Sequence, residues 1–153
     1  MSTRYTASEK LRANLQRVLV DLVDLHVQGK QSHWNVTGAG FRSLHLALDE
    51  VVDIAREHSD VIAERMRALQ VVPDGRTETV AATTDLTAYP ADLVSVEDTV
   101  DAIVERMSQV VAVVREVHAD VDAEDPASAD LLNNITNDLE KQAWMISSEN
   151  VTA

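Results

Sequence analysis

The chain has 153 residues, a length typical of one domain, and we expect residues 1–153 to fold as a single unit around one core. It contains no cysteine, which excludes disulfides, thiol catalysis and zinc–thiolate sites, and its 4 glycines and 3 prolines are too few for a turn-rich all-β fold. The formal net charge of −13 disfavours phosphate backbones and favours cations as partners, although plain solubility explains such a charge equally well.

Apolar residues recur every three or four positions along four segments, which predicts four amphipathic helices. The first helix is expected to begin at the capping-box sequence Thr6-Ala7-Ser8-Glu9 and to end near Val36, before the turn Thr37-Gly38-Ala39-Gly40. The second is expected to run from Phe41 to the turn Val72-Pro73-Asp74-Gly75. Its apolar stripe consists of Leu44, Leu48, Val51, Ala55, Ile62, Met66 and Leu69.

A long connection follows at residues 73–94, and we expect one short helix in it, around 80–86 or 90–93. Ser95, three positions before Asp98, predicts the N-cap of the third helix, and Asp125-Pro126 predicts the start of the fourth. Two helical hairpins joined by a long crossover predict an all-α, ferritin-like four-helix bundle. The sequence contains neither a membrane-spanning apolar stretch nor the apolar run of a signal peptide, so we expect a cytoplasmic protein with no membrane partner.

Two pairs of potential metal ligands stand out on the second helix. His45 with Asp49 and Asp60 with Glu64 have the i,i+4 spacing that places two side chains on one helix face. The pairs begin 15 positions apart, which is roughly 22 Å along a helix and too far for one metal ion. A second copy of this helix, running antiparallel, would bring the His45/Asp49 pair of one chain opposite the Asp60/Glu64 pair of the other. The midpoint of this contact would lie at residues 54–55, where the small side chain of Ala55 would allow the two helices to approach closely. The spacing therefore predicts a metal site shared by two subunits.

A further histidine joins this set through the first hairpin. Folding the chain back at Thr37–Gly40 places His33 opposite residue 44, and therefore beside His45. A site with nitrogen and oxygen ligands and no sulfur suits Fe(II), Mn(II) or Zn(II), and open coordination positions favour iron redox chemistry. The competing interpretation is that the carboxylates are solvated surface charge and that the two histidines are incidental.

The remaining histidines and the tryptophans carry weaker signals. His26, His58 and His118 have no comparable set of partners, and we expect them not to be ligands. On pattern alone, Trp34 is interpreted as part of the hairpin core, and Trp144 as a core or interface residue of the fourth helix.

The histidine and carboxylate motifs described above lie within the stretches Lys30–Val36, Leu44–Glu50 and Asp60–Arg65. These stretches resemble the Dps family, the mini-ferritins also called DNA-binding proteins from starved cells. The resemblance covers nearly the whole chain. It implies a hollow dodecamer built from twofold dimers, with ferroxidase sites at the twofold interfaces. Fe(II) is expected to be oxidised there by hydrogen peroxide, or by oxygen, and stored inside as a ferric mineral, which protects against oxidative damage.

The resemblance also implies roles for single residues. His33, His45 and Asp49 match the iron ligands from one subunit, and Asp60 and Glu64 match those from the other. Two further roles follow from it: Trp34 matches an electron-donating tryptophan beside the site, and the acids expected to line threefold pores for iron entry are Asp125 and Asp130.

Direct DNA binding is expected to be weak or absent. Many members of the family bind DNA through tails rich in Lys and Arg, whereas this chain has only Arg4 and Lys10 near its N-terminus and no basic residue in its last five positions. Two alternatives to the iron-storage cage remain: a shell that compacts nucleoid DNA with secondary iron chemistry, and a purely structural bundle with solvated acids.

Overall fold

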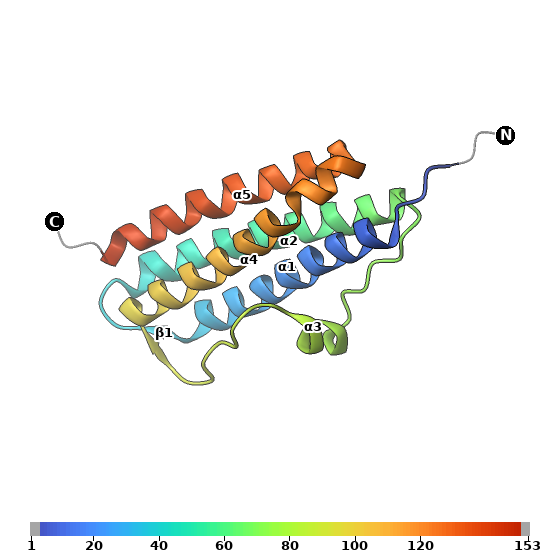
Figure 1. Ribbon diagram of the computed structural model, residues 1–153. Coiled ribbons are helices and arrows are strands. Elements are labelled where there is room, and N and C mark those ends of the chain that lie inside the picture. The colour runs from blue at the N-terminus through green and yellow to red at the C-terminus, as the bar shows by residue number, and fades with distance from the viewer. Residues whose placement is uncertain (1–3, 151–153) are drawn as a thin grey trace.

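The computed structural model describes residues 4–150, and within them four long helices lie side by side as a bundle (Figure 1). The elements in chain order are α1 Glu9–Asn35, β1 Val36–Thr37, α2 Phe41–Ala68, α3 Thr77–Thr83, β2 Val94–Ser95, α4 Val96–Glu124, α5 Pro126–Ser147 and the 3₁₀ helix η1 Ser148–Asn150. The all-α four-helix bundle with a long crossover carrying a short helix is confirmed. The last three residues of the C-terminal tail, where the sequence has no basic side chain, lie outside the described residues.

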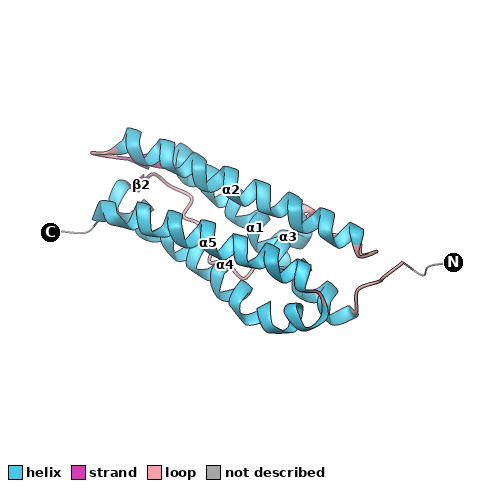
Figure 2. Ribbon diagram, turned by 90° about the horizontal axis from the view of Figure 1, so that it is seen from above, coloured by secondary structure: helices cyan, strands magenta, loops and turns pink. Residues whose placement is uncertain are grey.

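The two helical hairpins form two layers. Helices α1 and α2 make one layer and α4 and α5 the other, as Figure 2 shows from above. The crossover returns the chain to the end where α1 finished, because β1 and β2 pair in parallel with Val36 opposite Val94 and Thr37 opposite Ser95. None of the described helices combines the length and apolar character needed to cross a membrane.

The bundle core is built from the apolar stripes that the sequence predicts. The whole α2 stripe is at most 4% exposed, and α1 contributes Leu11, Leu15, Val18, Leu22 and Leu25. The expected place of Ala55 at a contact between two subunits is wrong, because Ala55 is fully buried in the core of its own subunit. The outer face of α2 is therefore the one that carries the polar residues.

The start of α1 differs from the prediction. Its N-cap is Ser8 rather than Thr6, and the Ser8 Oγ accepts a hydrogen bond from the Leu11 N–H at 3.1 Å. The carboxylate that completes the cap is Glu124 at the end of α4, which accepts hydrogen bonds from the Ser8 N–H and Oγ and from the Tyr5 hydroxyl. This tertiary contact explains why the helix begins two residues later.

The short helix of the crossover, α3, begins earlier than expected, at Thr77. The carboxylate of Asp74 accepts hydrogen bonds from the Arg76 backbone and guanidinium and from the Thr79 hydroxyl, which orders the chain just before and within the first turn of α3. Residues 90–93 are not helical. The predicted start of α4 is confirmed, since the Ser95 Oγ accepts a hydrogen bond from the Asp98 N–H at 3.0 Å, and Pro126 occupies the first turn of α5 as expected.

Helices α1 and α2 approach each other closely at Gly29. A Cβ atom built on this residue would lie 2.8 Å from the Cγ2 atom of Val52 on α2. The missing side chain thus allows the two helices to pack tightly, one helical turn away from His33.

Candidate metal centre

The hairpin turn between α1 and α2 brings two histidines together. Gly38 and Gly40 have φ values of 115° and 82°, a left-handed region that favours glycine. The turn folds α2 back along α1, and the rings of His33 and His45 stack with centroids 3.6 Å apart and planes 17° apart. The proximity expected from the hairpin is therefore observed.

Each imidazole is fixed by the backbone of the other residue. The Nδ1 atom of His33 lies 2.6 Å from the carbonyl oxygen of His45, and the Nδ1 atom of His45 lies 2.7 Å from the carbonyl oxygen of His33. Because a carbonyl oxygen only accepts hydrogen bonds, each Nδ1 must carry the proton. In a neutral imidazole the lone pair then lies on Nε2, the nitrogen with which such a histidine binds a metal.

Asp49 lies beside the histidine pair. Its Oδ1 atom lies 3.5 Å from the Nδ1 atom of His33 and accepts a hydrogen bond of 2.6 Å from the Lys30 ammonium. This hydrogen bond lowers the pKa of Asp49, so the carboxylate is anionic at neutral pH. Lys30 is the residue that sequence reasoning missed. The hairpin fold that places His33 opposite residue 44 also places Lys30 opposite residue 47, next to Asp49.

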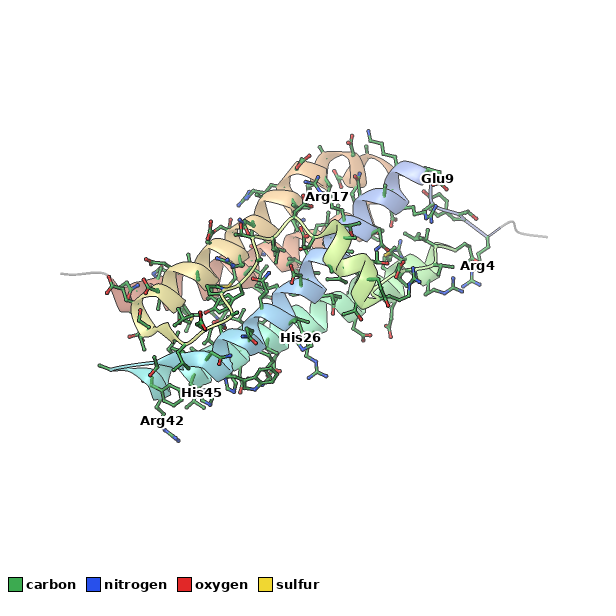
Figure 3. All side chains as sticks on the ribbon, turned by 90° about the horizontal axis from the view of Figure 1, so that it is seen from below. Arg4, Glu9, Arg17, His26, Arg42 and His45 are labelled. Atoms are coloured by element: carbon green, nitrogen blue, oxygen red, sulfur yellow. The ribbon has the colours of Figure 1, made fainter. Side chains whose placement is uncertain are left out.

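Asp60 and Glu64 do not join Asp49 and the histidine pair in the single chain. Both are exposed on the outer face of α2, and Asp60 is 11 positions, or roughly 16 Å, further along the helix than Asp49. Asp60 lines an open hollow of about 710 Å³ together with His26, Asp53 and Arg56. This hollow is separate from the histidine pair, because His26 lies midway along α1 whereas His45 lies near the hairpin end (Figure 3). Within residues 4–150, no three His, Asp or Glu side chains are arranged to hold a metal ion.

Both tryptophans are at the surface of the single subunit. Trp34 is 67% exposed, so its interpretation as part of the hairpin core is wrong. Trp144 is also 67% exposed, which excludes the core alternative and leaves the interface alternative as a prediction. The ring of Phe41 also stacks on His45, with a centroid distance of 5.0 Å.

Two other histidines form contacts between helices. The Nε2 atom of His58 on α2 lies 2.7 Å from the Asp138 carboxylate on α5, and the Nε2 atom of His118 on α4 lies 2.9 Å from the Asn133 amide oxygen on α5. These contacts join α5 to its neighbours on either side.

The two acids expected to line a pore have different surroundings. The Asp125 carboxylate is mostly buried and accepts hydrogen bonds from the Arg65 guanidinium at 2.7 and 2.9 Å and from the Ser128 hydroxyl. Its charge is thus neutralised inside the subunit, where it ties the α4–α5 junction to α2. Asp130 is exposed on the first turns of α5. The pore role of both residues stays a prediction.

Comparison with known proteins agrees with this architecture. Residues 12–151 match the family model described as a ferritin-like domain. The chain is 36% identical over 133 residues to the DNA protection during starvation protein of Agrobacterium fabrum, covering 86% of this chain and 82% of that one. It is similar to the structure of Dps from Microbacterium arborescens in the high iron form, with a TM-score of 0.87, 32% identity and coverage of 95% and 97%. It also resembles DpsA14 from Streptomyces coelicolor, with a TM-score of 0.91, 29% identity and coverage of 100% and 95%. The chain therefore belongs to the ferritin-like proteins and, among them, to the Dps family.

Proposed function

We propose that this protein oxidises Fe(II) at a site shared by two subunits and stores the ferric product inside a hollow shell. His33, His45 and Asp49 of one subunit would bind the ion together with Asp60 and Glu64 of the partner subunit. The observation that carries this proposal is the pair of stacked imidazoles, held in the tautomer that leaves the Nε2 lone pairs for a cation, beside the anionic Asp49.

The need for two subunits follows from the length of α2. In one chain, Asp49 lies beside the two histidines, but within residues 4–150 no three such side chains are arranged to hold a metal ion. The other two proposed ligands lie roughly 16 Å away along a rigid helix. An antiparallel α2 from a second copy brings residue 60 opposite 49 and residue 64 opposite 45. The exposed outer face of α2, which carries all four of these residues, is available for such a contact.

The donor set suits iron oxidation. Imidazole nitrogens bind Fe(II), and carboxylates are hard anionic ligands that stabilise Fe(III) more than Fe(II), so oxidation is favoured in their presence. When hydrogen peroxide is the oxidant, one molecule takes one electron from each of two Fe(II) ions and, with two protons, yields two molecules of water. This pairwise reaction avoids release of a hydroxyl radical. The exposed Trp34 indole, next to His33, would supply an electron when only one iron is present. Zn(II) or Mn(II) would compete for the same ligands.

We expect the assembly to be a homo-oligomer, with a dodecamer built from twofold dimers as the specific prediction, and a cytoplasmic location. The net charge of −13 on every copy would concentrate cations at the surface of the shell. Asp125 and Asp130 remain the candidates for pores through which iron enters.

Protection of DNA is proposed to act through removal of iron and peroxide rather than through contact. The relative from Agrobacterium fabrum is named for DNA protection during starvation, and a shell that compacts DNA is the second candidate function. Lys10, one of the two cations near the N-terminus, is paired with Asp120. A gel-shift assay at neutral pH and moderate salt should show no retardation of duplex DNA, and clear retardation would favour the second function.

The test of the iron site is a double substitution, Asp60→Asn with Glu64→Gln. Both changes keep the side-chain shape but remove the negative charge, so we expect the initial rate of ferric absorbance after addition of peroxide to Fe(II) to fall by about 100-fold or more. The matched control is Asp101→Asn with Glu105→Gln, an acidic pair with the same spacing on α4, which should leave the rate unchanged. A wild-type rate in the Asp60/Glu64 variant would contradict the proposed ligands.

A further inference from the structure

Two opposite charges lie between the proposed ligand pairs on the outer face of α2. Asp53 and Arg56 are exposed, and neither forms an ion pair with another residue in the described range 4–150. With 100° per residue, they fall with Asp49 and Asp60 inside an arc of about 60° around the helix axis. Asp53, Arg56 and Asp60 also line the same open hollow. The centre of the exposed stripe therefore presents one anion and one cation side by side.

The antiparallel register required by the shared site gives these two residues a partner. If residue 49 faces residue 60 and residue 45 faces residue 64, the midpoint lies between Ile54 and Ala55. Asp53 and Arg56 lie at equal distances on either side of this midpoint. Asp53 of one subunit then faces Arg56 of the partner subunit, and twofold symmetry repeats the contact.

The same pair of residues discriminates against a wrong register. If the two helices slid so that residue 53 faced residue 60, two aspartates would meet, and Asp49 would face Glu64. Like charges placed opposite each other are unfavourable. The proposed register contains one such contact, Asp49 opposite Asp60, whereas the slid register contains two and loses the attraction between Asp53 and Arg56, so the charges favour the proposed register.

We propose that Asp53 and Arg56 form two reciprocal ion pairs across a twofold contact between two copies of α2, and that these pairs set the register of the dimer. The occupant of the hollow is thus a second copy of this chain, chosen by charge complementarity. The inference rests on the shared site proposed above, because that site defines the register.

The test is a charge-swap series on the metal-free, full-length protein. Asp53→Arg and Arg56→Asp each replace two attractive contacts per dimer with two repulsive ones. Each single reversal should raise the protein concentration at which half of the chains are dissociated by at least about tenfold at low salt. The double variant Asp53→Arg with Arg56→Asp restores opposite charges and should return this concentration to within about threefold of the unsubstituted protein. Sedimentation velocity across a dilution series measures it, and circular dichroism shows that each variant is helical.

The control is Glu50→Arg, which makes the same change in charge as Asp53→Arg on the same helix. Glu50 faces α5, where it lines a separate hollow with Gln142 and Met145, so its reversal should not move the midpoint. Three results would overturn the inference: single reversals that assemble normally, a double variant that stays dissociated, or an equal effect of Glu50→Arg. Iron oxidation is read out separately. A double variant that assembles but does not oxidise Fe(II), together with an inactive unsubstituted protein, would refute the iron function and leave the ion pairs supported.

Discussion

Subunit complementation tests the shared metal site most directly. The perturbation uses two inactive variants, His33→Ala with His45→Ala on one chain and Asp60→Asn with Glu64→Gln on another. Each variant alone lacks one half of every site, because every site takes its histidines from one subunit and its distal carboxylates from the other. Each pure assembly should therefore oxidise Fe(II) no faster than iron in buffer.

The magnitude expected from mixing follows from symmetry. When the two chains are co-expressed in equal amounts, half of the twofold dimers combine one chain of each kind. Such a dimer has two sites, one with all five native ligands and one that lacks both the histidines and the distal carboxylates. About a quarter of all sites are then intact, and the oxidation rate per chain should be about a quarter of the unsubstituted rate.

The assay compares the two pure assemblies, the mixed assembly and the unsubstituted protein at equal chain concentration. The chains carry different affinity tags, so that mixed particles are isolated through both tags before Fe(II) and peroxide are added. A site contained within one subunit predicts no recovery, because neither chain then has a complete set of ligands. A mixed assembly as inactive as its parents, but correctly assembled by sedimentation, would refute the sharing of the site.

Three further predictions concern single residues of α1. Lys30→Met removes the ammonium that competes with a metal ion for the Asp49 carboxylate. Since the Lys30–Asp49 pair is partly exposed, we expect the affinity for Zn(II), measured by calorimetry, to rise by up to about fivefold. Weaker binding would show that Lys30 supports the site. Gly29→Ala places a Cβ atom 2.8 Å from the Val52 side chain and should lower the free energy of unfolding, measured by urea titration, by about 1–3 kcal/mol. An unchanged free energy would mean that α1 and α2 move apart at this point without loss of stability. Asp21 is fully buried, and this burial raises the pKa of its carboxyl to about 6. The fold thus favours the protonated form, so the stability from this group is full at low pH and is lost as the pH rises through 6, by about 1 kcal/mol between pH 5 and pH 7. Asp21→Asn should remove this part of the pH dependence of unfolding, and an unchanged slope would contradict the assignment.

The sequence predicted the features that depend on neighbours along the chain. Ser95 caps α4 because its hydroxyl needs only the Asp98 N–H three residues on, and the α2 stripe is buried because its spacing matches one helix face. The meeting of His33 and His45 was predictable for a similar reason, since a four-residue turn between two helices fixes which positions face each other. Local periodicity and one short turn were sufficient for these features.

The features that the sequence did not predict depend on distant residues. The N-cap of α1 is Ser8 rather than the predicted Thr6, because Glu124 at the far end of α4 accepts hydrogen bonds from Ser8. Its sequence pattern places Trp34 in the hairpin core, because large apolar side chains are usually buried in a monomer, yet Trp34 lies on the outer surface. For this residue the single chain is the wrong unit, if the surface of α1 and α2 is covered by a second copy as proposed.

The reciprocal bonds between the two histidines and each other's carbonyl groups have a kinetic consequence. Neither ring is able to turn without breaking its own hydrogen bond to the other residue's carbonyl oxygen and the stacking between the two rings, so both are held in one orientation once the chain has folded. A ferrous ion that reaches this face therefore meets nitrogen lone pairs that need no conformational search. The rate of Fe(II) binding would then be set by the loss of water ligands from the ion and by dissociation of the ion pair between Lys30 and Asp49.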